Sequence, residues 1–142
     1  MPTLLTVRRY ADAGELTLAA DLAAQLDDAL SSAHGPSHPR TLEARTARAD
    51  TRAALGDLSA AISLYRDVAE RHMYAGDPQT ASQIADRAHI LWQQITDPRT
   101  AAAISPAIVR MRAQIPGQGG YVHAQQYAAH LERVIHDAAV DH

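Results

Sequence analysis

The stretch GPSHPRTLEARTARADTRAALGDLSAAISLY, residues 35–65, decides the fold that this sequence predicts. Its His38-Pro39 pair ends a loop, because a proline disfavours the helical region for the residue before it. Proline also fixes its own φ at a value that suits the start of a helix. From Thr41 to Leu55 there is neither glycine nor proline, and alanine and arginine, two strong helix formers, predominate.

A Gly-Asp pair ends this helix and is followed by a second one. Gly56, in the pair Gly56-Asp57, suits the left-handed conformation that follows many helix ends. After the pair, apolar residues recur at steps of three and four, which predicts one buried face of a helix. These residues are Leu58, Ala61, Ile62, Tyr65 and Val68. The stretch therefore predicts a loop and a helical hairpin.

Pieces of this hairpin recur before and after it. Gly14 begins Gly-Glu-Leu as Gly56 begins Gly-Asp-Leu, at an offset of about 42 residues. Downstream, GDPQT at 76–80 repeats the end of the loop at 35–41. A period of this size is typical of stacked supersecondary units, so we expect a short array of helical hairpins.

These motifs resemble the tetratricopeptide repeat family, and especially its longer, kinesin-light-chain-like variant with a G-x-x-HP-x-T linker and a G-D-L-x-x-A turn. The structural turn residues that carry the resemblance are Gly14, His38, Pro39, Gly56 and Asp57. It covers roughly residues 4–114. The third unit departs from the pattern, with Thr96 where the turn glycine belongs and Pro106 inside its second helix.

The resemblance implies an all-α fold, a right-handed solenoid of about three antiparallel helix pairs with a terminal capping helix. The expected hairpins lie at about 2–33, 39–75 and 78–115, and the terminal helix at about 120–140. Residues 1–142 would form a single domain. Pro106 should kink or split its helix, and Tyr65 occupies an aromatic packing position of the family. A non-repeat helical bundle is the alternative fold.

Composition narrows the function classes. The chain has no cysteine, which excludes disulfides and thiolate metal sites. All 13 basic residues are arginine, which fits a GC-rich genome as well as a guanidinium chemistry. The net charge of −3 argues against a nucleic-acid binder. No apolar run is long enough for a signal peptide or a membrane span, so a cytoplasmic location is expected, with no membrane partner.

Three arginines form the predicted binding site. Arg45, Arg48 and Arg52 fall within about 60° of one another around a helix. First helices line the groove of the family that the chain resembles, which implies that this stripe grips an acidic peptide or a C-terminal carboxylate. Arg8 would extend the groove. The alternative is a stripe paired within the chain. Its candidate partners are Asp12, Asp50 and Asp86.

No motif predicts catalysis. The eight histidines lack the spacings typical of metal ligands and are interpreted as surface residues. There is no nucleophile elbow and no phosphate loop. The expectation is therefore no metal, no cofactor and no enzymatic activity, but an interaction module that binds a protein or peptide partner. The alternatives are a self-associating regulatory or scaffold domain of a larger protein, a homodimer through the C-terminal helix, or an effector domain for a small anion.

Overall fold

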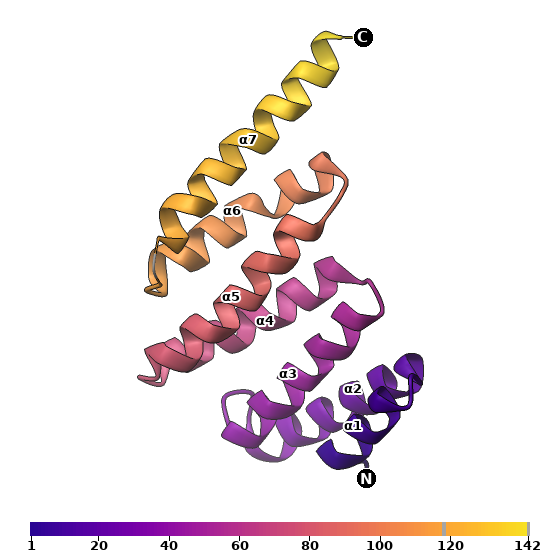
Figure 1. The fold of residues 1–142 in the computed structure, drawn as a ribbon. Helices are drawn as coiled ribbons and strands as arrows, with labels where there is room; N and C mark the ends of the chain where they lie inside the picture. Colours follow the sequence, from indigo (N-terminus) through magenta and orange to yellow (C-terminus); the bar gives the residue numbers. More distant parts are fainter. Residues whose placement is uncertain (118, 142) are drawn as a thin grey trace.

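The computed structural model describes residues 1–117 and 119–141, and these residues form seven helices and no strand (Figure 1). The helices are α1 (Leu4–Asp12), α2 (Leu16–His34), α3 (Pro39–Ala54), α4 (Leu58–Tyr74), α5 (Pro78–Gln94), α6 (Pro98–Gln114) and α7 (Gly120–Val140). The prediction of an all-α fold is confirmed.

Aspartates begin three of the helices. The side chains of Asp57, Asp77 and Asp97 each accept a hydrogen bond from the backbone N–H three residues further on, at the starts of α4, α5 and α6. Such a cap satisfies a first-turn amide that has no partner inside the helix. Asp97 acts in this way although Thr96 stands where the repeat pattern has glycine.

The predicted turn residues end and begin helices as their chemistry requires. His38 caps α3 through Nδ1, which accepts from the backbone N–H of Arg40 at 3.1 Å, and Pro39 is the first residue of that helix. Gly56 follows α3 with a φ of 81°. That left-handed conformation strains any residue with a Cβ. The turn therefore requires glycine.

Each helix packs mainly on the helices next to it in sequence. Helix α1 also contacts α3, and α4 contacts α6. The packing of α6 is more extensive on α7 than on α5. This arrangement is consistent with a helical repeat array, and Figure 1 shows the helices stacked from α1 at one end to α7 at the other.

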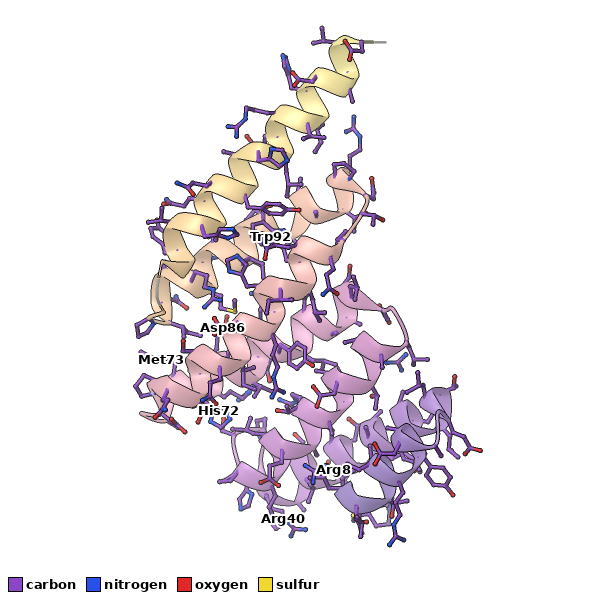
Figure 2. The ribbon with its side chains drawn as sticks, viewed as in Figure 1. Arg8, Arg40, His72, Met73, Asp86 and Trp92 are labelled. Atoms are coloured by element: carbon purple, nitrogen blue, oxygen red, sulfur yellow. The ribbon has the colours of Figure 1, made fainter. Side chains whose placement is uncertain are left out.

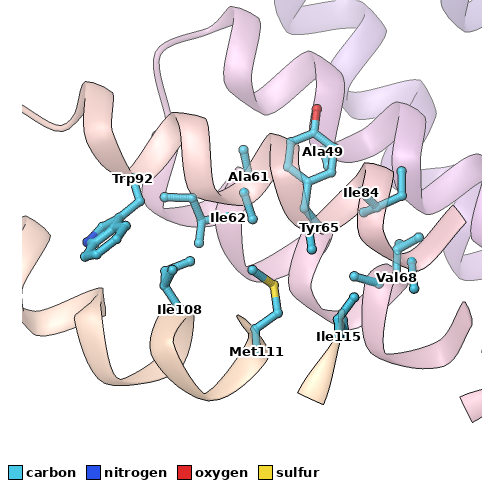
Figure 3. Close-up of a cluster of buried hydrophobic side chains, with 14 of the residues drawn as sticks. Ala49, Ala61, Ile62, Tyr65, Val68, Ile84, Trp92, Ile108, Met111 and Ile115 are labelled. Atoms are coloured by element: carbon cyan, nitrogen blue, oxygen red, sulfur yellow. The ribbon is translucent and has the colours of Figure 1, made fainter. Parts of the chain in front are cut away.

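The largest buried cluster contains residues of five successive helices, α3, α4, α5, α6 and α7 (Figure 3). Trp92 is fully buried in it, and its indole N–H donates to the carbonyl of Ala101 at 2.9 Å. Ala61 is fully buried too, and so is Ala19 in a smaller cluster that joins α1 and α2 to α3. Small side chains at these positions let helices approach closely.

Helix α6 is not split at its proline. It runs unbroken from Pro98 to Gln114 with Pro106 inside it. The proline lies on the exposed side of the helix. One turn earlier, the carbonyl of Ala101 accepts from the hydroxyl of Ser105 at 3.2 Å as well as from Trp92. Both side-chain bonds are made to a carbonyl before the proline, and the helix continues past it to Gln114.

Within the described part of the chain, none of the helices has both the length and the hydropathy needed to cross a membrane.

Candidate functional site

A groove of about 480 Å³ lies along α1, α3 and α5. Helix α3 supplies its central wall, α1 one side and the first turns of α5 the other, while His72 of α4 completes the lining. Figure 2 labels Arg8 and His72, two of the polar side chains that line it. The groove thus collects residues from alternate helices, far apart in the sequence.

The floor of the groove is apolar. Its apolar lining residues are Val7, Ala11, Pro39, Leu42, Ala47 and Ile84. Val7 and Leu42 are buried because they also pack beneath the surface on neighbouring helices. The alanines are small, which leaves space between α1 and α3. Threonine hydroxyls border this floor and come from Thr46, Thr51 and Thr80.

The charged lining residues are mostly acidic. The lining carboxylates belong to Asp12, Glu43 and Asp50, and the one lining arginine is Arg8. Among the described residues, neither Asp12 nor Glu43 takes part in an ion pair. The groove therefore presents more carboxylate than guanidinium.

Asp50 is held in place from outside the groove. Its Oδ1 accepts from the hydroxyl of Tyr65 and lies 3.5 Å from Nη1 of Arg87. Burial, and then the hydrogen bond to Asp50, raise the pKa of Tyr65, so its hydroxyl stays protonated and keeps donating. Tyr65 is buried, as its packing position predicts.

The arginine stripe lies on the face of α3 opposite the groove. At 100° per residue, its centre is roughly 170° from the centre of the groove residues of α3. Arg45 instead binds Asp27 of α2 through Nε and Nη2, both at 3.1 Å, and Asp67 of α4 through Nη1 at 2.5 Å. Arg48 reaches Asp27 at 3.2 Å and Asp28 at 3.6 Å.

Pairing within the chain, the alternative to a ligand-binding stripe, therefore holds for Arg45 and Arg48. The partners are Asp27, Asp28 and Asp67, and not Asp12, Asp50 and Asp86. The physical reason is that α2 and α4 both pack on α3 and bring their aspartates to this face. Arg52 is half-buried and does not line the groove. Of the four predicted binding arginines, only Arg8 lines it.

Asp27 is a fully buried carboxylate. Burial alone would lower the pKa of Arg45, but its hydrogen bonds and charge contacts with Asp27 and Asp67 outweigh burial and raise it. The guanidinium therefore remains charged and compensates Asp27, as a buried carboxylate requires. The sequence carried a signal for this residue, because Asp27 falls between Ala20 and Ala23 on an otherwise apolar helix face.

A second polar cluster joins α5, α6 and α7, and Figure 2 labels one of its members, Asp86. Arg112 Nε donates to His89 Nδ1 at 2.9 Å, and its Nη2 donates to Asp86 at 2.6 Å. Since Nδ1 of His89 accepts, Nε2 carries the proton and donates to Nδ1 of His123, 2.8 Å away. The interpretation of the histidines as surface residues is wrong for His89, which is buried.

This cluster does not form a metal site. Among residues 1–117 and 119–141, no group of three or more histidine or acidic side chains is placed to hold a metal ion. Both nitrogens of His89 are already engaged. Burial, and then the charges of Arg112 and His123, lower the pKa of His89 to about 4, so its imidazole is neutral at pH 7.

Comparison with known proteins adds no assignment. The chain matches no protein-family model. No curated protein matches its sequence either. The function must therefore be inferred from the groove and its chemistry.

Proposed function

We propose that this chain is a protein-interaction module that binds a peptide or helix of a partner protein in the α1/α3/α5 groove. The proposal includes a tetratricopeptide-like, right-handed arrangement in which α1, α3 and α5 are the first helices of successive pairs. The observation that carries it is the groove itself, about 480 Å³ with an apolar floor and a polar border.

The size and chemistry of the groove support this role. Small-molecule pockets usually measure about 300–1,000 Å³ and combine apolar walls with a few polar groups that fix orientation, and this groove has the same combination. Here the walls come from three helices, each held by its own caps and core contacts. Stacked helical pairs commonly use such a concave surface for extended partners.

The test is a peptide selection combined with one blocking substitution. Thr46 lies in the middle of the groove face of α3 and is only half-buried, so Thr46→Trp would fill the groove from its wall. Ser63→Trp, at an exposed position of α4 outside the groove, is the matched control. A displayed library of random peptides would be selected against the unaltered chain.

Selected peptides should bind the unaltered chain and the Ser63→Trp variant equally, and lose about tenfold or more in affinity for Thr46→Trp, a change of about 1.4 kcal/mol. Circular dichroism would verify that both variants keep their helices. The proposal fails if selection yields no specific peptide, or if the selected peptides bind Thr46→Trp as well as the unaltered chain.

Self-association through α7 is a second candidate function. Helix α7 packs mainly on α6, and its C-terminal part extends beyond α6 in Figure 1. Val122 and Val140 are 55% and 69% exposed on it. Light scattering should then give the mass of a dimer, and Val122→Glu with Val140→Glu should convert it to a monomer. A monomer for the unaltered chain at high concentration contradicts this candidate.

A further inference from the structure

We infer that the groove selects a basic, amphipathic segment of its partner, with apolar side chains for the floor and arginine or lysine for the rim. The inference rests on the proposed function, because it names the partner chemistry of the same groove. It replaces the acidic partner expected from the arginine stripe, because that stripe lies on the opposite face of α3 and its Arg45 and Arg48 are paired with aspartates of α2 and α4.

The first argument is the charge of the lining. Among the lining side chains, Asp12, Glu43 and Asp50 give three carboxylates against the single guanidinium of Arg8. Asp12 and Glu43 are exposed and form no ion pair in the part of the chain that the structure describes. Their carboxylates are available to a cationic side chain of a partner.

The second argument is the geometry of Asp50. Both of its donors, the Tyr65 hydroxyl and the Arg87 guanidinium, use the same oxygen, Oδ1. They fix the carboxylate while its side chain stays 53% exposed. The other oxygen, Oδ2, can therefore accept from a partner arginine or lysine without breaking either bond. A carboxylate fixed in advance loses less conformational entropy on binding than a mobile one.

The third argument is the floor. Apolar side chains from Val7, Leu42 and Ile84 line the same groove as the three carboxylates, and the two lining alanines are small. A partner must therefore present apolar and cationic residues on one surface, as an amphipathic helix or strand does. An acidic segment would place its carboxylates beside Asp12, Glu43 and Asp50, and like-charge neighbours disfavour such a complex.

The experiment compares two synthetic peptides of about 14 residues by fluorescence anisotropy at pH near 7.5. Both carry leucines at helical spacing, and they differ only in having arginine or glutamate at every charged position. Because the apolar contacts are shared, the difference in affinity reports the charge preference. Glu43→Arg reverses a charge inside the groove, and Glu132→Arg makes the same change at an exposed position of α7.

The arginine peptide should bind about tenfold or more tightly than the glutamate peptide, and this preference should shrink as salt is raised. Glu43→Arg should abolish or invert it, whereas Glu132→Arg should leave it within about twofold. The inference is overturned if the glutamate peptide binds equally or better, or if the preference survives Glu43→Arg with helicity intact.

The failures of the two proposals can be told apart. If the glutamate peptide binds and Thr46→Trp prevents it, the groove binds a partner but the inferred chemistry is wrong. If neither peptide binds and selection yields none that Thr46→Trp excludes, both proposals fail. A dimer that dissociates on Thr46→Trp would show that a second copy covers the groove, and this result also overturns the basic partner.

Discussion

Lowering the pH from about 7.5 to about 5 should destabilise the fold through one residue, His89. Its Nδ1 accepts from Arg112, 2.9 Å away, and its Nε2 donates to His123 at 2.8 Å. A second proton would have to enter at Nδ1, where Arg112 already donates. Asp86 and Trp92 lie beside it on α5, and the charge of Asp86 favours the charged imidazole but does not outweigh burial and the other charges.

The direction and size of this change in stability follow from the pKa of His89. Burial, and then the charges of Arg112 and His123, lower that pKa from 6.5 to about 4. Between these values the unfolded chain binds a proton that the folded chain does not. The free energy of unfolding therefore falls as the pH drops below 6.5, and the loss is complete near pH 4. At 1.36 kcal/mol per pH unit, the loss at pH 5 is about 2 kcal/mol.

The assay is urea unfolding followed by the fluorescence of Trp92, the single tryptophan, which is buried against His89 and Tyr127. His89→Asn keeps an acceptor near the position of Nδ1 but cannot titrate. Between pH of about 7.5 and about 5, its free energy of unfolding should therefore fall by about 2 kcal/mol less than that of the unaltered chain. His136→Asn, at an exposed position, is the control. Equal pH dependence of the unaltered chain and His89→Asn would refute the reasoning.

Three further predictions concern stability, each measured by urea unfolding followed by circular dichroism. Asp27→Ala leaves Arg45 and Arg48 without their buried partner and should lower the free energy of unfolding by about 3–5 kcal/mol. The control Asp28→Ala, at an exposed position, should lower it by under about 1 kcal/mol. Similar losses for the two variants would contradict the buried pair. Trp92→Ala should cost about 3–5 kcal/mol because the site is fully buried, and a loss under 1 kcal/mol would argue against that packing. Gly56→Ala should cost about 1–2 kcal/mol because of the φ of 81°, and an unchanged midpoint would show that the turn is not left-handed.

The helices and their ends could be predicted because their signals are local. Pro39 and Gly56 bound α3 in the sequence as they do in the structure, and the apolar spacing after Asp57 defines α4. Capping, proline geometry and helical period each act within a few residues. Local chemistry therefore determines where the chain turns, and most of the secondary structure could be predicted from it.

The orientation of each helix face could not be predicted in the same way. The helical period places Arg45 and Arg48 on one face of α3, but it does not say whether that face meets the groove or the neighbouring helices. The answer depends on Asp27, 18 residues before Arg45, and on Asp67, 22 residues after it. The groove and the His89 cluster likewise combine side chains from helices that are distant in sequence.

A single environment-sensitive fluorophore tests the central claim most directly. The chain has no cysteine, so Thr46→Cys and Ser63→Cys each provide one thiol for labelling, inside the groove and outside it. Adding the arginine peptide should change the emission of the Thr46→Cys label and saturate at the concentration found by anisotropy, while the Ser63→Cys label stays unchanged. A peptide that binds without affecting the label at position 46, or that affects both labels alike, would contradict a binding site in the α1/α3/α5 groove.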